Sequence, residues 1–478
     1  MRTPIRLRTS LRRRPAALVL PGVLLAAGLQ LGAGPAAQAT SPADAASAGR
    51  AAPEGKLRLA GTGETAVPDS WIVVLKGPAG ATSAAASSGA TATAPASSGA
   101  APSTAPADVP AVARDLVARA DGARVGHVYR AALHGFSARM SQAQAARTAA
   151  DSRVAYVRQD TRVRIAETPT RPAPKPLAAA DGTQPDAPWG LDRIDQRQLP
   201  LSTTYTYRTT APDVSVYVID TGLRTTHREF GGRASVGIDT VNDGQNGNDC
   251  HGHGTHVGGV AAGSTYGVAK EAELVAVRVL NCQGSGTTSG VVAGIEWVTA
   301  KAAKPAVANM SLGGGASDVL DRAVRNSIRS GVTYAVSAGS SGQPGGACSA
   351  SPARLPEAIT VAGSDRSDRV MSSSNTGKCV SLYAPGAQIP SAWRDSDTAT
   401  ATLSGTSMAT AHASGAAALH LGFRPGDTPA QVKKGLVDNA TGGVLQGPVP
   451  VVPDKLLYTL YLPWPVSAEG ALLLTSGQ

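Results

Sequence analysis

Aromatic side chains are scarce in this 478-residue chain, which has 3 Phe, 5 Trp and 10 Tyr, or 4% of its residues. The hydrophobic fraction is nevertheless 42%, so we expect a core built mainly from Ala, Val, Leu and Ile. The length is enough for one large domain with one or two smaller segments.

Residues 181–478 have no excess of basic over acidic residues. Residues 1–180 have 22 Lys and Arg against 10 Asp and Glu, whereas residues 181–478 have 22 against 24. The second part therefore lacks the electrostatic footprint that nucleic-acid binding needs. We expect no nucleic-acid partner.

Two protease signatures are also missing. No HExxH motif supplies zinc ligands and a base, so we expect no catalytic metal, although His251, His253 and His256 leave a zinc cluster as an alternative. The Asp-Thr-Gly that starts at Asp220 has no second copy, whereas an aspartic protease needs two carboxylates that share a proton. Only a homodimer could supply the second carboxylate, and this alternative stays open.

Long apolar runs are absent after the N-terminal segment, so no membrane association is expected in the mature protein. The N-terminus has several arginines, then an apolar run from about Ala16 to Ala33, then "AAQA" ending at Ala39. This order predicts a secretory signal peptide, residues 1–39, and an extracellular protein. The alternative is an uncleaved membrane anchor, which Pro21 and Gly22 disfavour.

Composition divides the rest of the chain. We expect a flexible pro-region at 40–68, a small β-α-β-β-α-β module at 69–166 and, within it, a flexible Ala/Ser/Thr/Gly/Pro insertion at 79–107. A Pro-rich linker follows at 167–182. Residues 183–460 alternate between strand-like and helical segments, which is typical of an α/β domain with a mostly parallel sheet and helices on both faces. The tail at 461–478 matches no motif.

Three motifs carry groups for acyl transfer. "VYVIDTGL" places Asp220 at the end of a buried strand, where open α/β sheets build their sites. "DCHGHGTHVGG" and "LSGTSMATAH" place His253 and Ser407 at the N-termini of helices. A hydroxyl nucleophile, an imidazole base and a carboxylate that orients the imidazole make up a catalytic triad. Taken alone, Ser407 could equally be a helix N-cap.

With these motifs and "MSLGGG", the chain resembles the subtilases, and within them the secreted proteinase K-like group, over nearly all of residues 69–460. "SWIVVLKG" and "ALHGFSARMSQAQA" resemble the subtilase propeptide, an α+β ferredoxin-like folding chaperone and inhibitor. The resemblance implies a subtilisin-like fold and a monomeric serine endopeptidase, made as a zymogen, that cleaves peptide or protein substrates through an acyl-enzyme on Ser407. We expect self-cleavage between about Thr170 and Asp186, in or near the linker.

The resemblance also implies further site residues. The four cysteines allow three pairings or four free thiols, and the family implies Cys250–Cys282 and Cys348–Cys379. Two segments are expected to line an extended peptide, where glycines permit close backbone approach. They contain Gly284, Ser285 and Gly286 on one side and Ser311, Leu312 and Gly313 on the other.

Three positions depart from the family pattern. Ser340, in "YAVSAGSSGQ", stands where an asparagine completes the oxyanion hole, so we expect a slow protease. Ala411 replaces a proline after the nucleophile, and it is the one feature that suggests acyl transfer to amines as an alternative reaction. Ser381 replaces an aspartate that in the family helps bind a structural calcium, beside the carbonyls of Pro356 and Ala358. We expect no cofactor, and a structural calcium stays open as an alternative. The main alternative is a weakly active or inactive subtilase scaffold that binds peptides.

Overall fold

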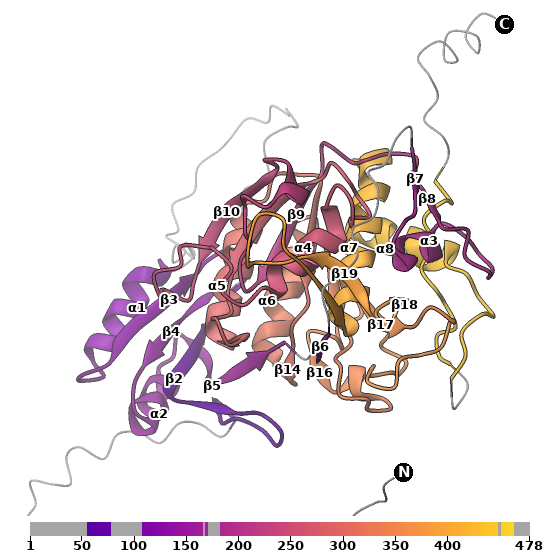
Figure 1. Ribbon diagram of the computed structural model, residues 1–478. Helices are drawn as coiled ribbons and strands as arrows, with labels where there is room; N and C mark the ends of the chain where they lie inside the picture. The colour runs from indigo at the N-terminus through magenta and orange to yellow at the C-terminus, as the bar shows by residue number, and fades with distance from the viewer. Residues whose placement is uncertain (1–54, 78–107, 166–167, 171–181, 448–450, 463–478) are drawn as a thin grey trace, which may run out of the picture. The chain divides into compact units, whose positions relative to one another are not determined.

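The computed structural model describes residues 55–77, 108–165, 168–170, 182–447 and 451–462 (Figure 1). The expected signal peptide, the insertion at 79–107 and most of the linker and C-terminal tail lie outside these ranges. Within them, no helix combines the length and the apolar character that crossing a membrane requires.

The N-terminal module is a small sheet covered by two helices (Figure 1). The strand order is β1-β5-β2-β4-β3. Both helices contribute to one core with Trp71, Val73 and Phe136. The elements are β1 (Leu57–Arg58), β2 (Ala66–Leu75), α1 (Val109–Ala118), β3 (Arg124–Tyr129), β4 (Gly135–Arg139), α2 (Gln142–Ala150) and β5 (Val154–Arg164).

Two strands of this module are longer than the sequence pattern predicts. β2 starts at Ala66, although the apolar run starts only after Asp69, and β5 continues past Asp160 to Arg164. The extension of β5 pairs with β12 (Ser285–Thr287) in the second domain. Its stability therefore depends on a distant partner that a local pattern does not reveal.

The second domain is built on a seven-stranded parallel sheet, as predicted, with the order β10-β11-β9-β13-β15-β17-β18. Its main elements are β9 (Ser215–Asp220), β10 (Ala234–Asp239), α4 (His253–Ala262), β11 (Glu273–Arg278), α5 (Thr288–Lys301), β13 (Ala306–Met310), α6 (Asp318–Arg329), β15 (Val332–Ser337), β17 (Ile359–Ser364), β18 (Leu382–Pro385), α7 (Thr406–Phe423) and α8 (Pro429–Asn439).

Helices cover both faces of this sheet (Figure 1). Along β9, Val216 and Val218 join the core cluster that contains α4, α7 and α8, while Tyr217 and Ile219 join the cluster with α5 and α6. Since both faces are buried, the strand is a continuous apolar run rather than an alternating one. Asp220 ends this strand and is fully buried.

Shorter elements surround the sheet. They are β6 (Thr168–Thr170), β7 (Thr183–Pro185), α3 (Trp189–Ile194), β8 (Thr204–Thr206), η2 (Arg228–Phe230), β14 (Gly314–Gly315), η3 (Gly346–Cys348), β16 (Ala350–Ser351), β19 (Ile389–Ala392) and β20 (Thr400–Ser404). β20 matters most for the site because it leads directly into α7.

Both expected disulfides are present, Cys250–Cys282 and Cys348–Cys379, with sequence separations of 32 and 31 residues. In the chain-entropy picture, closing a loop of this length stabilises the fold by about 3 to 4 kcal/mol. Cys282 lies two residues before Gly284, so the first bridge also ties the loop before His253 to β12.

We expect the double substitution Cys250→Ser/Cys282→Ser to lower the free energy of unfolding by roughly 3 kcal/mol. The measurement is denaturant unfolding, with Cys348→Ser/Cys379→Ser as the matched control for loop size. Loss of the first bridge should also raise KM, because that bridge restrains β12, the strand with which β5 pairs. The second pair is a control for loop size alone, since Gly346 and Ser349 beside Cys348 also line the cavity next to Gly313. Recovery of a Cys250–Cys348 peptide in non-reducing mapping would contradict the pairing itself.

Candidate active site

A buried carboxylate–imidazole pair forms at the end of β9. Asp220 Oδ1 lies 2.6 Å from His253 Nδ1, and both side chains are fully buried. Gly254 makes this approach possible, because a Cβ there would lie 2.0 Å from the carbonyl oxygen of Gly222. The N-terminus of α4 therefore packs directly onto the loop that follows Asp220.

Asp249 organises the loop before His253, although the sequence patterns did not single it out. Its carboxylate accepts hydrogen bonds from the backbone N–H groups of His251, Gly252 and Thr255 and from the Thr221 hydroxyl, at 2.7 to 2.9 Å. An Asp whose side chain bonds backbone N–H groups a few residues ahead is typical of a turn. The Asp at the start of "DCHGHGT" could therefore have predicted this turn. This network fixes the backbone on both sides of the pair.

Ser407 sits at the start of α7, in the second helical position. Its hydroxyl donates to the carbonyl of Ser311 at 3.2 Å, and the Ser311 hydroxyl donates back to the carbonyl of Ser407 at 3.0 Å. Asn309, at the end of β13, donates in turn to the Ser311 hydroxyl oxygen at 3.0 Å. The predicted cleft segment 311–313 is thus joined to the candidate nucleophile. Ala411 is buried within α7, which is continuous across it.

Ser340 contacts the same helix N-terminus. Its Oγ accepts the backbone N–H of Thr406 at 3.0 Å and lies 3.0 Å from Thr406 Oγ1. Thr406 Oγ1 is also 2.6 Å from Ser337 Oγ. Since the N-cap residue Gly405 has no side chain to cap α7, Ser340 supplies that cap from another element. The sequence did not suggest this role.

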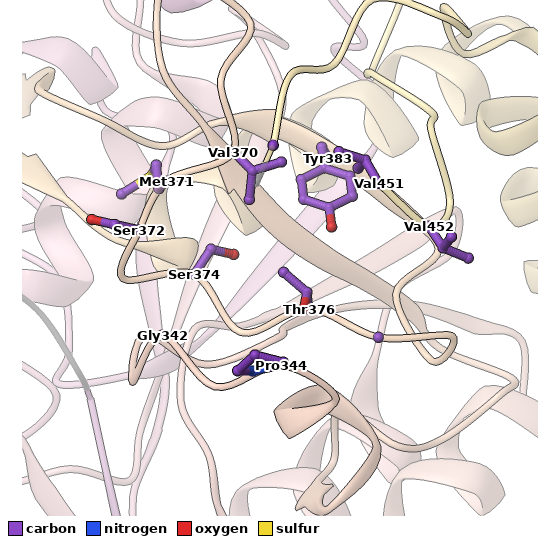
Figure 2. A pocket seen from close by; sticks show the side chains of 12 residues that line it. Gly342, Pro344, Val370, Met371, Ser372, Ser374, Thr376, Tyr383, Val451 and Val452 are labelled. Carbon is purple, nitrogen blue, oxygen red and sulfur yellow. The ribbon is translucent and has the colours of Figure 1, made fainter. Parts of the chain in front are cut away.

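The loop that carries Ser340 is glycine-rich but well anchored. Asn375 Oδ1 accepts the Ser341 hydroxyl at 2.8 Å and the backbone N–H of Gln343 at 3.0 Å, and Gly342 N–H donates to Ser373 O at 2.7 Å. Gly342 and Pro344 of this loop also border an apolar pocket of about 210 Å³. Figure 2 shows this pocket, which Tyr383 lines as well. These bonds restrict movement of Ser340.

The end of β5 occupies the predicted peptide-binding segments. It pairs antiparallel with β12, with Ser285 opposite Arg164 and Gly286 opposite Val163, and Ile165 N–H donates to Gly284 O at 3.2 Å. On its other side, Arg164 exchanges two backbone hydrogen bonds with Gly313, at 3.2 and 3.3 Å. Leu312 is buried rather than paired. A strand bonded on both edges in this way is how an extended peptide would bind.

Two groups of residues that could suggest a metal site have their ligand atoms engaged elsewhere. His256 Nε2 contacts the carbonyl oxygens of Ile389 and Ala401, at 3.1 and 3.2 Å, while His253 pairs with Asp220. The Nε2 of His256 is therefore already engaged by backbone carbonyls rather than directed at a shared ligand position with His253. Within the described residues, Asp243, Cys250 and Cys282 also lie together, but the two sulfurs form a disulfide and Arg278 pairs with the carboxylate.

Comparison with known proteins assigns the class. The model of the subtilase family matches residues 211–454, and the model of the peptidase inhibitor I9 family matches residues 70–166. The chain belongs to the subtilase family. It is therefore a serine endopeptidase of the subtilisin type with an N-terminal I9 propeptide domain.

Individual relatives agree with this class. The chain is 49% identical over 339 residues to an extracellular serine proteinase from Thermus sp. (strain Rt41A), which covers 71% of this chain and 78% of the relative. It is 39% identical to a cuticle-degrading serine protease from Arthrobotrys oligospora, over 73% of this chain and 84% of that protein. The crystal structure of a cold-adapted subtilisin-like serine proteinase superposes with a TM-score of 0.56 at 50% identity, covering 57% of this chain and 99% of that chain.

Proposed function

We propose that the protein is a secreted endopeptidase that cleaves peptide bonds through an acyl-enzyme on Ser407, with His253 as general base and Asp220 as its orienting carboxylate. The observation that carries the proposal is the 2.6 Å contact between His253 Nδ1 and Asp220 Oδ1 in a site without solvent exposure. This contact fixes the tautomer in which Nε2 can accept a proton.

The reaction follows from these positions. An extended substrate pairs with Ser285–Thr287 and Gly313 as β5 does, which presents its carbonyl carbon to Ser407 Oγ. His253 accepts the hydroxyl proton during attack and returns it to the leaving amine. The N–H of Ser407 and the positive end of α7 stabilise the tetrahedral oxyanion. Water then hydrolyses the ester, with His253 again as base.

Labelling with a fluorophosphonate probe tests this proposal. The processed wild-type enzyme should react at Ser407, as read by peptide mass spectrometry, and His253→Ala should react at least about a hundredfold more slowly because the hydroxyl loses its base. Ser330→Ala, at the end of α6, controls for handling of the protein. Labelling of another serine, or none, would favour the peptide-binding scaffold.

The I9 domain supports inhibition by the chain's own propeptide. Glu296 on α5 accepts the backbone N–H groups of Arg130, Ala131 and Ala132 at 2.5 to 2.7 Å. Asp160 accepts both the N–H and the hydroxyl of Ser289 at the first turn of α5, at 3.0 and 2.6 Å. Burial raises the pKa of Asp160, and these bonds oppose that shift. With this docking, the end of β5 fills the cleft and excludes substrate.

Strand pairing supports a proposal for the position of the first cut. Backbone hydrogen bonds hold the chain in the cleft up to Ile165, whose N–H donates to Gly284 O, and Thr168 of β6 pairs with Ser404, three residues before Ser407. β20, the partner of β6, leads directly into α7 and Ser407. The end of β5 reaches the same place through Gly313, two residues after the Ser311 carbonyl that accepts the Ser407 hydroxyl. The self-cleavage expected between about Thr170 and Asp186 stays a prediction. From this pairing we propose an additional, earlier cut in one of the bonds that join Ile165 to Thr168.

We expect Glu167→Pro to slow a first cut at the Ala166–Glu167 bond at least tenfold, because a proline after Ala166 makes that bond a tertiary amide and fixes φ at residue 167. The measurement is intact mass of the secreted protein over time. Ala179→Pro, within the linker, is the matched control and should leave the first cut unchanged. A first new N-terminus between residues 171 and 186 in wild type, unaffected by Glu167→Pro, would contradict this position.

A further inference from the structure

One ammonium group joins helix α8 to the segment before β17. Lys433 Nζ donates to the carbonyl oxygen of Pro356 at 2.7 Å and to that of Ala358 at 2.7 Å. Lys433 lies in the second turn of α8, whose N-terminus is fixed by a capping box between Thr428 and Gln431. The lysine is therefore presented from an ordered helix and is partly buried.

Residue 381 completes the surroundings of these carbonyls. Ser381 Oγ accepts the N–H of Thr360 at 3.1 Å and lies 3.5 Å from the carbonyl oxygen of Ala358. Ser381 and Lys433 thus converge on the same oxygen atom. The Ser381 hydroxyl is a neutral donor to this oxygen and the Lys433 ammonium is a cationic one, so neither residue contributes a negative charge.

These residues do not fit the structural calcium that the family resemblance suggests. Calcium takes six to eight oxygen ligands, with carboxylates among the strongest. Here the two carbonyl oxygens already accept from an ammonium, and Ser381 offers a hydroxyl in place of a carboxylate. A divalent cation would have to displace Lys433 and would gain no counter-charge from residue 381.

We propose that Lys433 is a built-in cation that takes the structural place of a bound metal at this position. Its two charge-assisted hydrogen bonds neutralise the same carbonyl dipoles and hold α8 against the entry to β17. Because the cation is part of the chain, its contribution does not depend on free ion concentration, whereas a bound ion stabilises only by mass action. Burial lowers the pKa of Lys433, and the nearby Glu357 opposes that shift.

The geometry suggests a pair of substitutions that would replace the lysine cation with a bound calcium ion. Lys433→Met keeps the apolar stem but removes the charge. Pro356 O then loses its ammonium donor, and Ala358 O keeps only the 3.5 Å contact with Ser381 Oγ. Adding Ser381→Asp supplies a carboxylate beside the same oxygens. The double variant Lys433→Met/Ser381→Asp should therefore bind calcium where the wild-type chain does not.

Melting temperatures in chelator and in millimolar calcium test the proposal. All variants are made in the full-length chain with Ser407→Ala, so that self-digestion cannot interfere and the result does not depend on the proposed catalysis. Lys433→Met should melt at least about 3 °C lower than its parent in both buffers. The double variant should regain that loss in calcium only, and terbium luminescence should report one additional site relative to the parent.

Two controls make the outcome decisive. Lys434→Met removes the neighbouring lysine, which is exposed and pairs with Asp438, and it should change the melting temperature by less than about 1 °C. Ser381→Asp with Lys433 retained should show no calcium response. The proposal is overturned if Lys433→Met melts like Lys434→Met, or if calcium raises the melting temperature of the parent as much as that of the double variant.

Discussion

Replacing Ser407 with alanine should leave the secreted chain uncleaved, with the propeptide still attached, and should abolish peptide hydrolysis. Loss of the nucleophile from a triad lowers kcat by about 10⁶, a magnitude measured for a subtilisin. Since the same hydroxyl is proposed to cut the precursor, hydrolysis and maturation should be lost together. Intact mass of the secreted protein and cleavage of a peptide anilide are the two measurements.

Adding a trace of processed wild-type enzyme sharpens this experiment. The Ser407→Ala precursor should then be cut slowly, at a rate proportional to the amount of added enzyme. If the rate constant of the first cut in wild type does not depend on protein concentration, that cut is intramolecular. Normal maturation of Ser407→Ala in a protease-deficient host would show that another enzyme processes the chain. Ser330→Ala should mature like wild type.

Ser340→Asn should raise kcat by at least tenfold, which corresponds to about 1.4 kcal/mol of transition-state stabilisation. An oxyanion donor must lie about 2.7–3.1 Å from the developing charge, and the Ser340 hydroxyl is instead engaged with Thr406. An asparagine amide is longer and can donate to the oxyanion. The upper limit is about 10²–10³, the loss measured when such a donor is removed from a subtilisin.

The gain should appear in kcat with KM nearly unchanged, because the added hydrogen bond forms mainly in the transition state. Ser340→Ala is the matched control. It removes the cap on Thr406 without adding a donor, so it should destabilise the protein by about 1 kcal/mol and should not raise kcat. An unchanged or lower kcat for Ser340→Asn would mean that the Thr406 contact is itself required for the rate.

The fold was predictable because its pattern is local. β9, β13 and β15 are apolar runs between helical segments. The start of α8 is visible in the sequence as the capping-box pair Thr428 and Gln431, with Pro429 at the first helical position. The residue identities around Asp220, His253 and Ser407 were equally local, since each belongs to a short motif. Their mutual distances follow from the sheet order, which places the end of β9 beside α4.

The contacts that joined distant segments could not be predicted in this way. Ser340 caps a helix 66 residues further on, and Lys433 reaches carbonyls about 75 residues before it. A serine or lysine has many possible partners, and only tertiary packing selects one. Ser381 marked the position where the family resemblance expects a carboxylate for calcium. Nothing near Ser381 in the sequence indicated that Lys433 would supply a cation at the same carbonyls.

The two domains also share hydrophobic contacts, and this affects how durable the processed enzyme is. Ile72, Tyr129 and Leu133 of the I9 domain belong to the same buried cluster as Val291 and Ile295 of α5. Removal of the I9 domain returns part of that apolar surface to water, so the processed domain has a smaller thermodynamic margin than its precursor. Its lifetime in an extracellular medium is then set by the height of its unfolding barrier, and a half-life at working temperature describes it better than an equilibrium constant.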